Sequence, residues 1–376
     1  MKKFKLAQIV PALNSGGVEQ GTIDVANYLS TIKIKNTIIS SGGKMLSYLN
    51  KKYVNHFELS VNSKNILKMP FLAKKINRII KENNINILHI RSRGPAWLLP
   101  YINKINLKTV STFHNVYGHQ NFIKKIYNKG LTKTDYIVAI SQYVKEEIIK
   151  IYKINQDNIV VINRGIDTDF YNAKIEEEKK YMEFIKKTNI SSDNKIILYP
   201  GRLTDWKGQL EFLNIIEQFN NYPYIFYFVG DDKNTSYAKK LVNQIKIKNL
   251  SNNCKILGHL EKDDLKMMYH CSDLIISSPI KAEGFGRIVS EGLAMKKMLI
   301  AYNYGGVKNQ LEGLDDIYKV SPHDQEELRN RIKIVLESPS ENFGNIKEKA
   351  RYNVVQNFSK KLMLEKYTNL YEGISP

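Results

Sequence analysis

The chain has 376 residues, which is enough for two domains and a large core, and its 43% hydrophobic and 25% charged residues are ordinary for a globular protein. No apolar run reaches the roughly 18 residues of a membrane-spanning helix, and the basic start of the chain fits a first strand better than a signal peptide. Cys254 and Cys271 match neither a metal-binding spacing nor a disulfide framework, so we expect a reducing, cytoplasmic location.

The net charge of +20 comes mostly from lysine and allows two interpretations. One is a set of solvated helix surfaces in a sequence biased toward Lys, Ile and Asn, as an AT-rich genome produces. The other is peripheral docking on the anionic inner face of the cytoplasmic membrane, through lysines such as Lys74, Lys75, Lys124 and Lys125. Nucleic acid is not an expected partner, because no recognisable binding module accompanies the charge.

Residues 5 to 163 alternate short apolar runs with amphipathic stretches. The expected strands are Lys5–Val10, Asn36–Ser40, His56–Val61, Ile87–Arg91, Lys108–Phe113, Tyr136–Ile140 and Asn158–Ile162. Helices are expected at Val18–Ser30, Asn65–Lys81 and Gln142–Ile151. Such alternation predicts βαβ units and a parallel sheet with helices on both faces. Ligands of these sheets bind beyond the carboxyl ends of the strands, so the loops that follow strands are the candidate sites.

Three of these loops carry residues of interest. Gly16 and Gly17 precede a helix and either place backbone N–H groups against a phosphate or simply form a turn. His114 ends a strand, where a lone histidine is either structural or faces a ligand. Arg91 and Arg93 follow another strand and offer an anionic acceptor a positive charge, although no motif supports that interpretation.

A second βαβ series begins at Lys195–Tyr199, and Pro200–Gly208 follows that strand. Arg202 and Lys207 lie in this loop, beside the start of a helix expected at 209–219. Two cations next to a helix N-terminus suit a diphosphate, because arginine can grip it through two N–H groups and lysine adds a point charge. Further elements are expected at 225–229, 235–247, 255–257, 324–338, 342–356 and 359–373.

Residues 274 to 306 contain the most informative pattern. A buried strand at 274–278 leads to a loop with Glu283, a helix that starts near Gly286, a strand at 298–301 and the turn Gly305-Gly306. Glu283 and Glu291 are eight residues apart, about 12 Å along a helix, so they can face opposite ends of an extended ligand. The glycines between them let backbone approach a ligand closely.

This stretch resembles the Glu-x7-Glu element of retaining glycosyltransferase family 4, which has the GT-B fold. Four further strings resemble motifs of that family: Gly201-Arg202-Leu203 with Lys207-Gly208, Gly16-Gly17 with Glu19, Thr112-Phe113-His114-Asn115, and Gly165-Ile166-Asp167. The last makes Asp167-Thr168-Asp169 a part of the connection between domains rather than a metal-binding D-x-D motif. The chain departs from the family pattern at Arg164, at Asp231-Asp232 and at Asn309.

The resemblance implies an α/β fold of two Rossmann-like domains that face each other across a cleft. The first, at 1–168, would be the acceptor side, and the second, at 169–358, would bind the nucleotide sugar. A final helix at 359–376 would cross back to the first domain, and residues 172 to 193 would form a polar connection.

The resemblance also implies a function and a set of site residues. The protein would move a sugar from a UDP- or GDP-sugar to a glycan or lipid-linked acceptor with retention, without a metal or a cofactor. Arg202 and Lys207 would neutralise the departing diphosphate, Glu283 would orient the sugar, Glu291 would hold the ribose and His114 would contact the sugar. The remaining donor-binding residues would be Gly16, Gly17, Gly284, Phe285 and Gly286.

Two other functions remain open at this point. A sugar-nucleotide 2-epimerase with the same fold would need no acceptor, but beyond the shared fold the chain lacks the acid and histidine set of that enzyme. The other is a non-catalytic member of the family that binds a sugar nucleotide or a partner. Loss of Glu283, Arg202 or Lys207 would have favoured it, and all three are present. The sequence leaves the sugar, the base, the acceptor and the linkage undetermined. A role in surface polysaccharide or lipopolysaccharide synthesis is an expectation from the family.

Overall fold

The computed structural model describes residues 4–63, 65–172, 178–188, 190, 194–230 and 235–375. The chain forms two compact units, one made of Met1–Arg164 and Lys361–Pro376 and the other of Gly165–Lys360. These divisions lie a few residues from the expected boundaries at 168 and 358. Asp231, Asp232 and most of the expected polar connection at 172–193 lie outside the described residues.

The first unit contains a seven-stranded sheet in the order β3-β2-β1-β4-β5-β6-β7. Its strands are β1 (Leu6–Ile9), β2 (Asn36–Ser40), β3 (Val54–Glu58), β4 (Ile87–Ile90), β5 (Lys108–Phe113), β6 (Tyr136–Ala139) and β7 (Ile159–Val161). Every pairing is parallel, for example β1 with β2 and β4. The parallel order brings the carboxyl ends of β1, β4 and β5 to one edge, where Gly16, Arg91 and His114 follow them.

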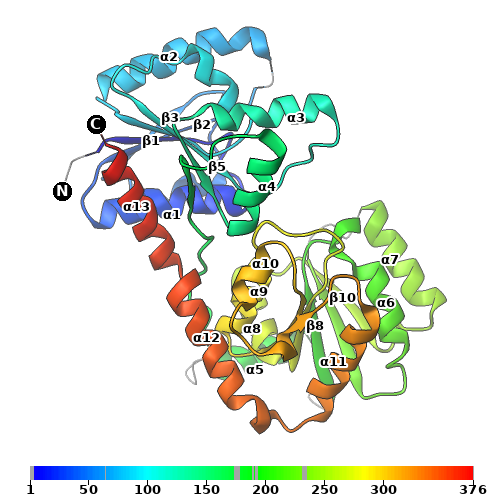
Figure 1. The fold of residues 1–376 in the computed structure, drawn as a ribbon. Coiled ribbons are helices and arrows are strands. Elements are labelled where there is room, and N and C mark those ends of the chain that lie inside the picture. The colour runs from blue at the N-terminus through cyan, green and yellow to red at the C-terminus, as the bar shows by residue number, and fades with distance from the viewer. Residues whose placement is uncertain are drawn as a thin grey trace. The chain divides into compact units, whose positions relative to one another are not determined.

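The described α-helices of this unit are α1 (Gly17–Thr31), α2 (Met69–Glu82), α3 (Phe122–Lys129), α4 (Gln142–Tyr152) and α13 (Lys360–Ile374) (Figure 1). Side-chain caps stabilise the N-termini of two of these helices. The Ser141 hydroxyl accepts a hydrogen bond from the Val144 N–H at α4, and the Asn121 side chain accepts one from the Ile123 N–H at α3.

The C-terminal helix α13 belongs to the core of the first unit. It packs beside α1 against the sheet (Figure 1), and Leu364, Tyr367 and Tyr371 share one apolar cluster with Val25 and Leu29 of α1. The chain therefore ends in the unit in which it begins.

The second unit contains a six-stranded parallel sheet in the order β10-β9-β8-β11-β12-β13. Its strands are β8 (Lys195–Pro200), β9 (Tyr224–Val229), β10 (Cys254–Gly258), β11 (Leu274–Ser277), β12 (Met298–Tyr302) and β13 (Lys319–Val320). Two loops at its carboxyl edge are in direct backbone contact, since a Cβ on Gly230 would lie 1.9 Å from the Gly201 carbonyl oxygen. Only glycine fits there, and this contact fixes the start of the loop that carries Arg202 and Lys207.

The helices of this unit are α5 (Glu178–Thr188), α6 (Gln209–Glu217), α7 (Ser236–Ile247), α8 (Lys262–Cys271), α9 (Arg287–Ala294), α10 (Gly306–Leu311), α11 (Gln325–Glu337) and α12 (Gly344–Phe358). The α/β architecture with two parallel sheets confirms the expected fold class. None of the described helices is both long enough and apolar enough to span a membrane.

Candidate active site

Lys207 and Glu283 form an ion pair in the second unit. Lys207 ends a 3-10 turn at Asp205–Lys207, and Gly208, with a φ of 84°, then redirects the chain into α6. The Lys207 ammonium donates a hydrogen bond to Glu283 Oε1, and the two side chains are only 11% and 9% exposed. The ammonium also lies 4.7 Å from the centre of the Trp206 ring. Two residues that the sequence assigned to one site thus neutralise each other.

Arg202 lies in the same loop and is exposed. Its carbonyl oxygen accepts a hydrogen bond of 3.0 Å from the side chain of Gln209, which is fully buried at the start of α6. Among the described residues, the Arg202 guanidinium has no hydrogen-bond or ion-pair partner. The backbone of Arg202 is therefore held while its charged end stays available, and sequence reasoning did not identify Gln209 as the residue that holds it.

Glycines bring the Glu283 loop close to the turn after β12. The Gly306 N–H donates to the Glu283 carbonyl oxygen over 2.8 Å, and a Cβ on Gly306 would lie 2.3 Å from the Gly284 carbonyl oxygen. Gly286, with a φ of 87°, precedes α9. The first N–H groups of α9 therefore follow directly on the loop that carries Glu283, as an anion site at a helix N-terminus requires.

Glu291 is buried inside α9, with both carboxylate oxygens in use. The Tyr269 hydroxyl donates to Oε2 over 3.0 Å, and the Arg287 guanidinium donates to Oε1 over 2.8 Å. The negative charge of Glu291 raises the pKa of Arg287, and burial together with that charge raises the pKa of Tyr269. A ligand hydroxyl that bound Glu291 would have to share the carboxylate with these two groups.

The Phe285 side chain is 4% exposed and lies 5.8 Å from the Phe358 ring, between ring centres. Its carbonyl oxygen accepts a hydrogen bond from the buried Gln310 side chain. The side chain of Phe285 is thus part of the core, so a contact with a donor would have to come from its backbone.

The first unit brings His114, Gly17 and Arg164 together. His114 Nε2 lies 3.1 Å from the Arg91 carbonyl oxygen, and Nδ1 lies 3.3 Å from Arg164 Nη1. Burial and the charges of Arg164 and Arg91 hold the His114 pKa well below its usual value, so the ring is neutral. It donates from Nε2 and accepts at Nδ1. A Cβ on Gly17 would lie 2.6 Å from Arg164 Nη2.

Asp167 has a structural role that accounts for its place in the string Asp167-Thr168-Asp169. Its carboxylate accepts a hydrogen bond from the Phe170 N–H over 3.1 Å and pairs with Lys360. These contacts tie the start of the second unit to Lys360, the last residue before the chain returns to the first unit. Such a position is expected of a connection between domains.

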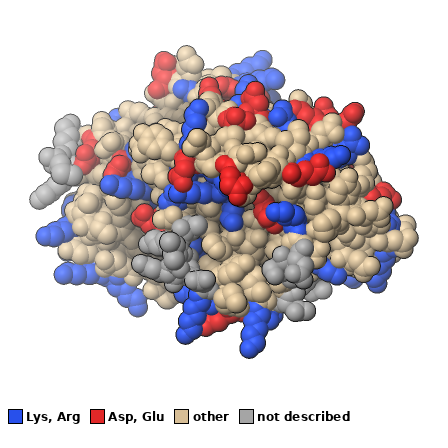
Figure 2. Space-filling model, turned by 90° about the horizontal axis from the view of Figure 1, so that it is seen from below, with Lys and Arg blue, Asp and Glu red and all other residues tan. Residues whose placement is uncertain are grey.

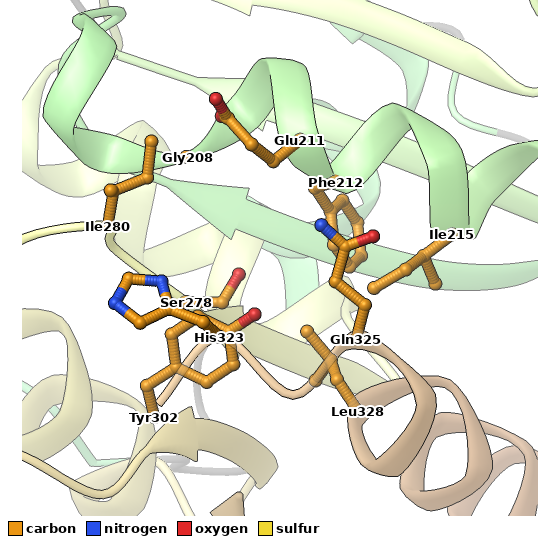
Figure 3. A pocket seen from close by; sticks show the side chains of 10 residues that line it. All are labelled: Gly208, Glu211, Phe212, Ile215, Ser278, Ile280, Tyr302, His323, Gln325 and Leu328. Atoms are coloured by element: carbon orange, nitrogen blue, oxygen red, sulfur yellow. The ribbon is translucent and has the colours of Figure 1, made fainter. Parts of the chain in front are cut away.

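An open pocket lies at the carboxyl ends of β11 and β12 in the second unit. Figure 3 shows its lining, with side chains of α6 on one side and His323 and Tyr302 on the other. The lining residues are Gly208, Glu211, Phe212, Ile215, Ser278, Ile280, Tyr302, His323, Gln325 and Leu328. The pocket adjoins the Lys207 loop at Gly208, but no predicted site residue lines it.

Two family models match the chain. Residues 15–170 match the model described as Glycosyltransferase Family 4, and residues 181–353 match the model described as Glycosyl transferases group 1. Each match covers most of one sheet, and the Lys207, Glu283 and Glu291 region falls inside the second.

Curated relatives carry names of the same class. N-acetyl-alpha-D-glucosaminyl L-malate synthase of Bacillus anthracis is 23% identical over 344 residues, which are 87% of this chain and 86% of the relative. Lipopolysaccharide 1,2-N-acetylglucosaminetransferase of Salmonella typhimurium is 27% identical over 180 residues, 46% of each protein.

Solved structures agree with the fold over the whole chain. A glycosyltransferase from Rickettsia africae has a TM-score of 0.88 at 37% identity, covering 100% of this chain and 99% of that one. HepE of Anabaena, in complex with UDP and glucose, has a TM-score of 0.83 at 19% identity, covering 99% and 100%. The sequence motifs, the two sheets and these matches together show that the chain belongs to glycosyltransferase family 4 and has the GT-B fold.

Proposed function

We propose that this glycosyltransferase moves a sugar from a nucleoside diphosphate sugar, UDP- or GDP-linked, to a glycan or lipid-linked acceptor with retention of configuration. The observation that carries the proposal is the loop set of the second unit. It places the exposed Arg202, the Lys207–Glu283 pair and the start of α9 at one edge of the sheet. The Anabaena structure with UDP supports a nucleotide donor.

The donor diphosphate would displace the Glu283 carboxylate from the Lys207 ammonium and bind the ammonium in its place. Arg202 and Lys207 would then neutralise the charge that builds up on the departing diphosphate, which is commonly the largest single contribution to catalysis. No metal ion or cofactor is needed for this role, because the protein itself supplies the positive charge. Glu283, released from Lys207, would accept hydrogen bonds from hydroxyls of the transferred sugar and orient it.

The other predicted residues would act through hydrogen bonds. Glu291 would share its carboxylate between Arg287, Tyr269 and the ribose hydroxyls. Neutral His114 would contact the sugar from the first unit, and Gly16 and Gly17 would offer backbone N–H groups. Retention would follow from attack on the same face of the sugar from which the diphosphate departs, with the diphosphate as base, because we assign none of the described residues as a covalent nucleophile.

We further propose that the enzyme acts at the cytoplasmic face of a membrane in surface polysaccharide or lipopolysaccharide synthesis. The Salmonella relative supports the pathway, and α3 supports the location. Phe122, Ile123 and Ile126 of α3 are 75%, 74% and 43% exposed, next to the exposed Lys124 and Lys125. Apolar side chains flanked by lysines suit insertion into an anionic leaflet.

One face of the molecule carries mixed charge. On the face drawn in Figure 2, Lys and Arg side chains are interspersed with Asp and Glu. That face therefore fits ordinary solvated charge.

The experiment that tests the donor site is thermal stabilisation by a panel of nucleoside diphosphates and their sugars, without added metal. A ligand that binds the native state increases the free energy of unfolding by mass action, by about 2.7 kcal/mol at a hundredfold excess over Kd, and so raises Tm. We expect UDP or GDP and the matching sugar to raise Tm in the wild type and not in Arg202→Ala. No shift with any nucleotide in the folded protein would favour a non-catalytic protein that binds a partner instead.

A further inference from the structure

The first unit contains a buried cation with unused hydrogen-bond donors. Arg91 follows β4 and is 1% exposed, and its Nε and Nη1 atoms have no hydrogen-bond partner among the described residues. The guanidinium lies 5.2 Å from the centre of the Tyr367 ring of α13. Ring contact does not satisfy N–H donors, and a buried charge is unfavourable unless an anion or a set of acceptors meets it.

A second guanidinium converges on the same place. A Cβ on Gly21 of α1 would lie 3.1 Å from Arg91 Nη2 and 3.3 Å from Arg164 Nη1. A Cβ on Gly17, one turn earlier, would lie 2.6 Å from Arg164 Nη2. Glycine at both positions leaves room for the two arginines beside the first turns of α1, where free N–H groups and the helix dipole add positive potential.

The neighbouring histidines are neutral, so the positive charge of this cluster comes from the two arginines. Burial, and then the charges of Arg164 and Arg91, lower the pKa of His114. Burial, and then the charge of Arg91, lower the pKa of His89. His114 accepts from Arg164 and donates to the Arg91 carbonyl, which makes it a positioning residue for both arginines.

We propose that Arg91 and Arg164 form an oxyanion site in the first unit, which takes a carboxylate or phosphate group of the acceptor. Arg164 is partly exposed and gives the site its accessible side, while Arg91 supplies the unsatisfied donors at its base. Charge-assisted hydrogen bonds to such a group are among the strongest in proteins. The identification with the acceptor rests on the proposed glycosyl transfer, whereas anion binding itself does not.

The test measures anion binding to the full chain at constant ionic strength. Glycerol phosphate and succinate are titrated by calorimetry into the wild type, Arg164→Gln, Arg202→Gln and Arg78→Gln. Arg78 is 80% exposed on α2 and controls for the loss of one charge. We expect Arg164→Gln to weaken binding of at least one probe about tenfold or more. Arg202→Gln and Arg78→Gln should both retain that binding. Binding of glycerol phosphate would identify the acceptor group as a phosphate, and binding of succinate would identify it as a carboxylate.

A second measurement uses the wild type alone, so it does not depend on whether a variant folds. Phenylglyoxal modifies accessible arginines, and peptide mass spectrometry reports each one separately. We expect the bound probe to protect Arg164 and to leave Arg78 reactive. Unprotected Arg164, or equal binding in the wild type and Arg164→Gln, would overturn the oxyanion site. Binding lost only in Arg202→Gln would assign the anion to the donor site, which overturns this inference and leaves the proposed function standing.

Discussion

The Lys207–Glu283 pair explains how a deep site can hold opposite charges before a donor arrives. Each side chain is about nine-tenths buried, so neither charge is well solvated and each depends on the other. A diphosphate can replace the carboxylate as the partner of Lys207, because one anion is exchanged for another, and hydroxyls of the sugar would then serve as the hydrogen-bond partners of Glu283. The pair is therefore a resting state of the proposed donor site rather than an alternative to it.

Lys207→Ala should remove the cation that would bind the donor diphosphate, and it should also leave Glu283 buried without a partner. We expect turnover to fall about 100- to 1000-fold or more, and the free energy of unfolding to fall by about 3 kcal/mol. Kinetics and urea unfolding measure the two effects. Lys308→Ala, at an exposed lysine of α10, is the matched control.

The double variant Lys207→Met/Glu283→Gln separates the two effects of Lys207. It removes both charges and should recover most of the stability that Lys207→Ala loses, while activity stays absent. Wild-type activity in Lys207→Ala would show that the diphosphate is held elsewhere.

The neutral histidines of the first unit predict a pH dependence of stability. Folding lowers the pKa of His89 and His114 below the unfolded value of about 6.5. As the pH falls below that value, the unfolded chain takes up protons first. The free energy of unfolding should therefore decrease, by up to about 1.4 kcal/mol per pH unit for each histidine, until the folded-state pKa is reached.

Urea unfolding of the wild type and His114→Gln between pH 7 and 5 measures this contribution. We expect the variant to show a shallower loss of stability on acidification, because one of the histidines with a lowered pKa no longer takes up its proton. His259→Gln, at an exposed histidine, is the matched control. Parallel curves for the wild type and His114→Gln would contradict the neutral assignment of His114.

At the scale of single elements, α13 closes the first unit through one buried polar contact as well as apolar packing. The Tyr371 hydroxyl and His89 Nδ1 are 2.7 Å apart, and His89 Nε2 lies 2.7 Å from the Thr112 hydroxyl. Tyr371→Phe keeps the ring but leaves Nδ1 without its partner. We expect a loss of about 1 to 3 kcal/mol in the free energy of unfolding. Tyr352→Phe, 67% exposed, should change nothing measurable.

The amphipathic helix α3 predicts membrane binding that depends on two apolar side chains. Phe122→Ser/Ile123→Ser should reduce co-sedimentation with anionic phospholipid vesicles several-fold, because both side chains are about three-quarters exposed and available to insert. Ile105→Ser, 79% exposed outside α3, controls for general surface hydrophobicity. Equal sedimentation of all three proteins would reject α3 as the docking element.

At the scale of the whole molecule, the alternation of apolar and amphipathic segments predicted both parallel sheets. The expected strands at 36–40 and 108–113 match β2 and β5, because both segments are short and rich in the β-branched residues Thr, Ile and Val. The third strand was expected at 56–61 but spans Val54–Glu58, where the pairing of Asn36 with Val54 sets the register. Helices α8 and α10 were missed, since no element was expected between 257 and 274 and the second helix has six residues that start within a glycine pair.

The candidate site was predictable as a set of residues but not as a set of contacts. Lys207 and Glu283 stand in recognisable strings, yet they are 76 residues apart and nothing in either string indicates that they pair. Arg164 was noted only as a departure from the family pattern, although it contacts His114 and adjoins Gly17 and Gly21. Such contacts arise from strand order, which decides which loops meet at an edge.

The central claim is sugar transfer from a nucleoside diphosphate donor by the loops of the second unit. Its most direct measurement is release of nucleoside diphosphate from UDP- and GDP-sugars, with and without a glycan and lipid extract as acceptor source. Proton NMR of the sugar product identifies its anomeric configuration. We expect release with one donor, dependent on Lys207 and stimulated by the extract, and a product that keeps the donor's configuration. A donor that binds but never loses its sugar under either condition would contradict the account, and an inverted product would contradict its mechanism.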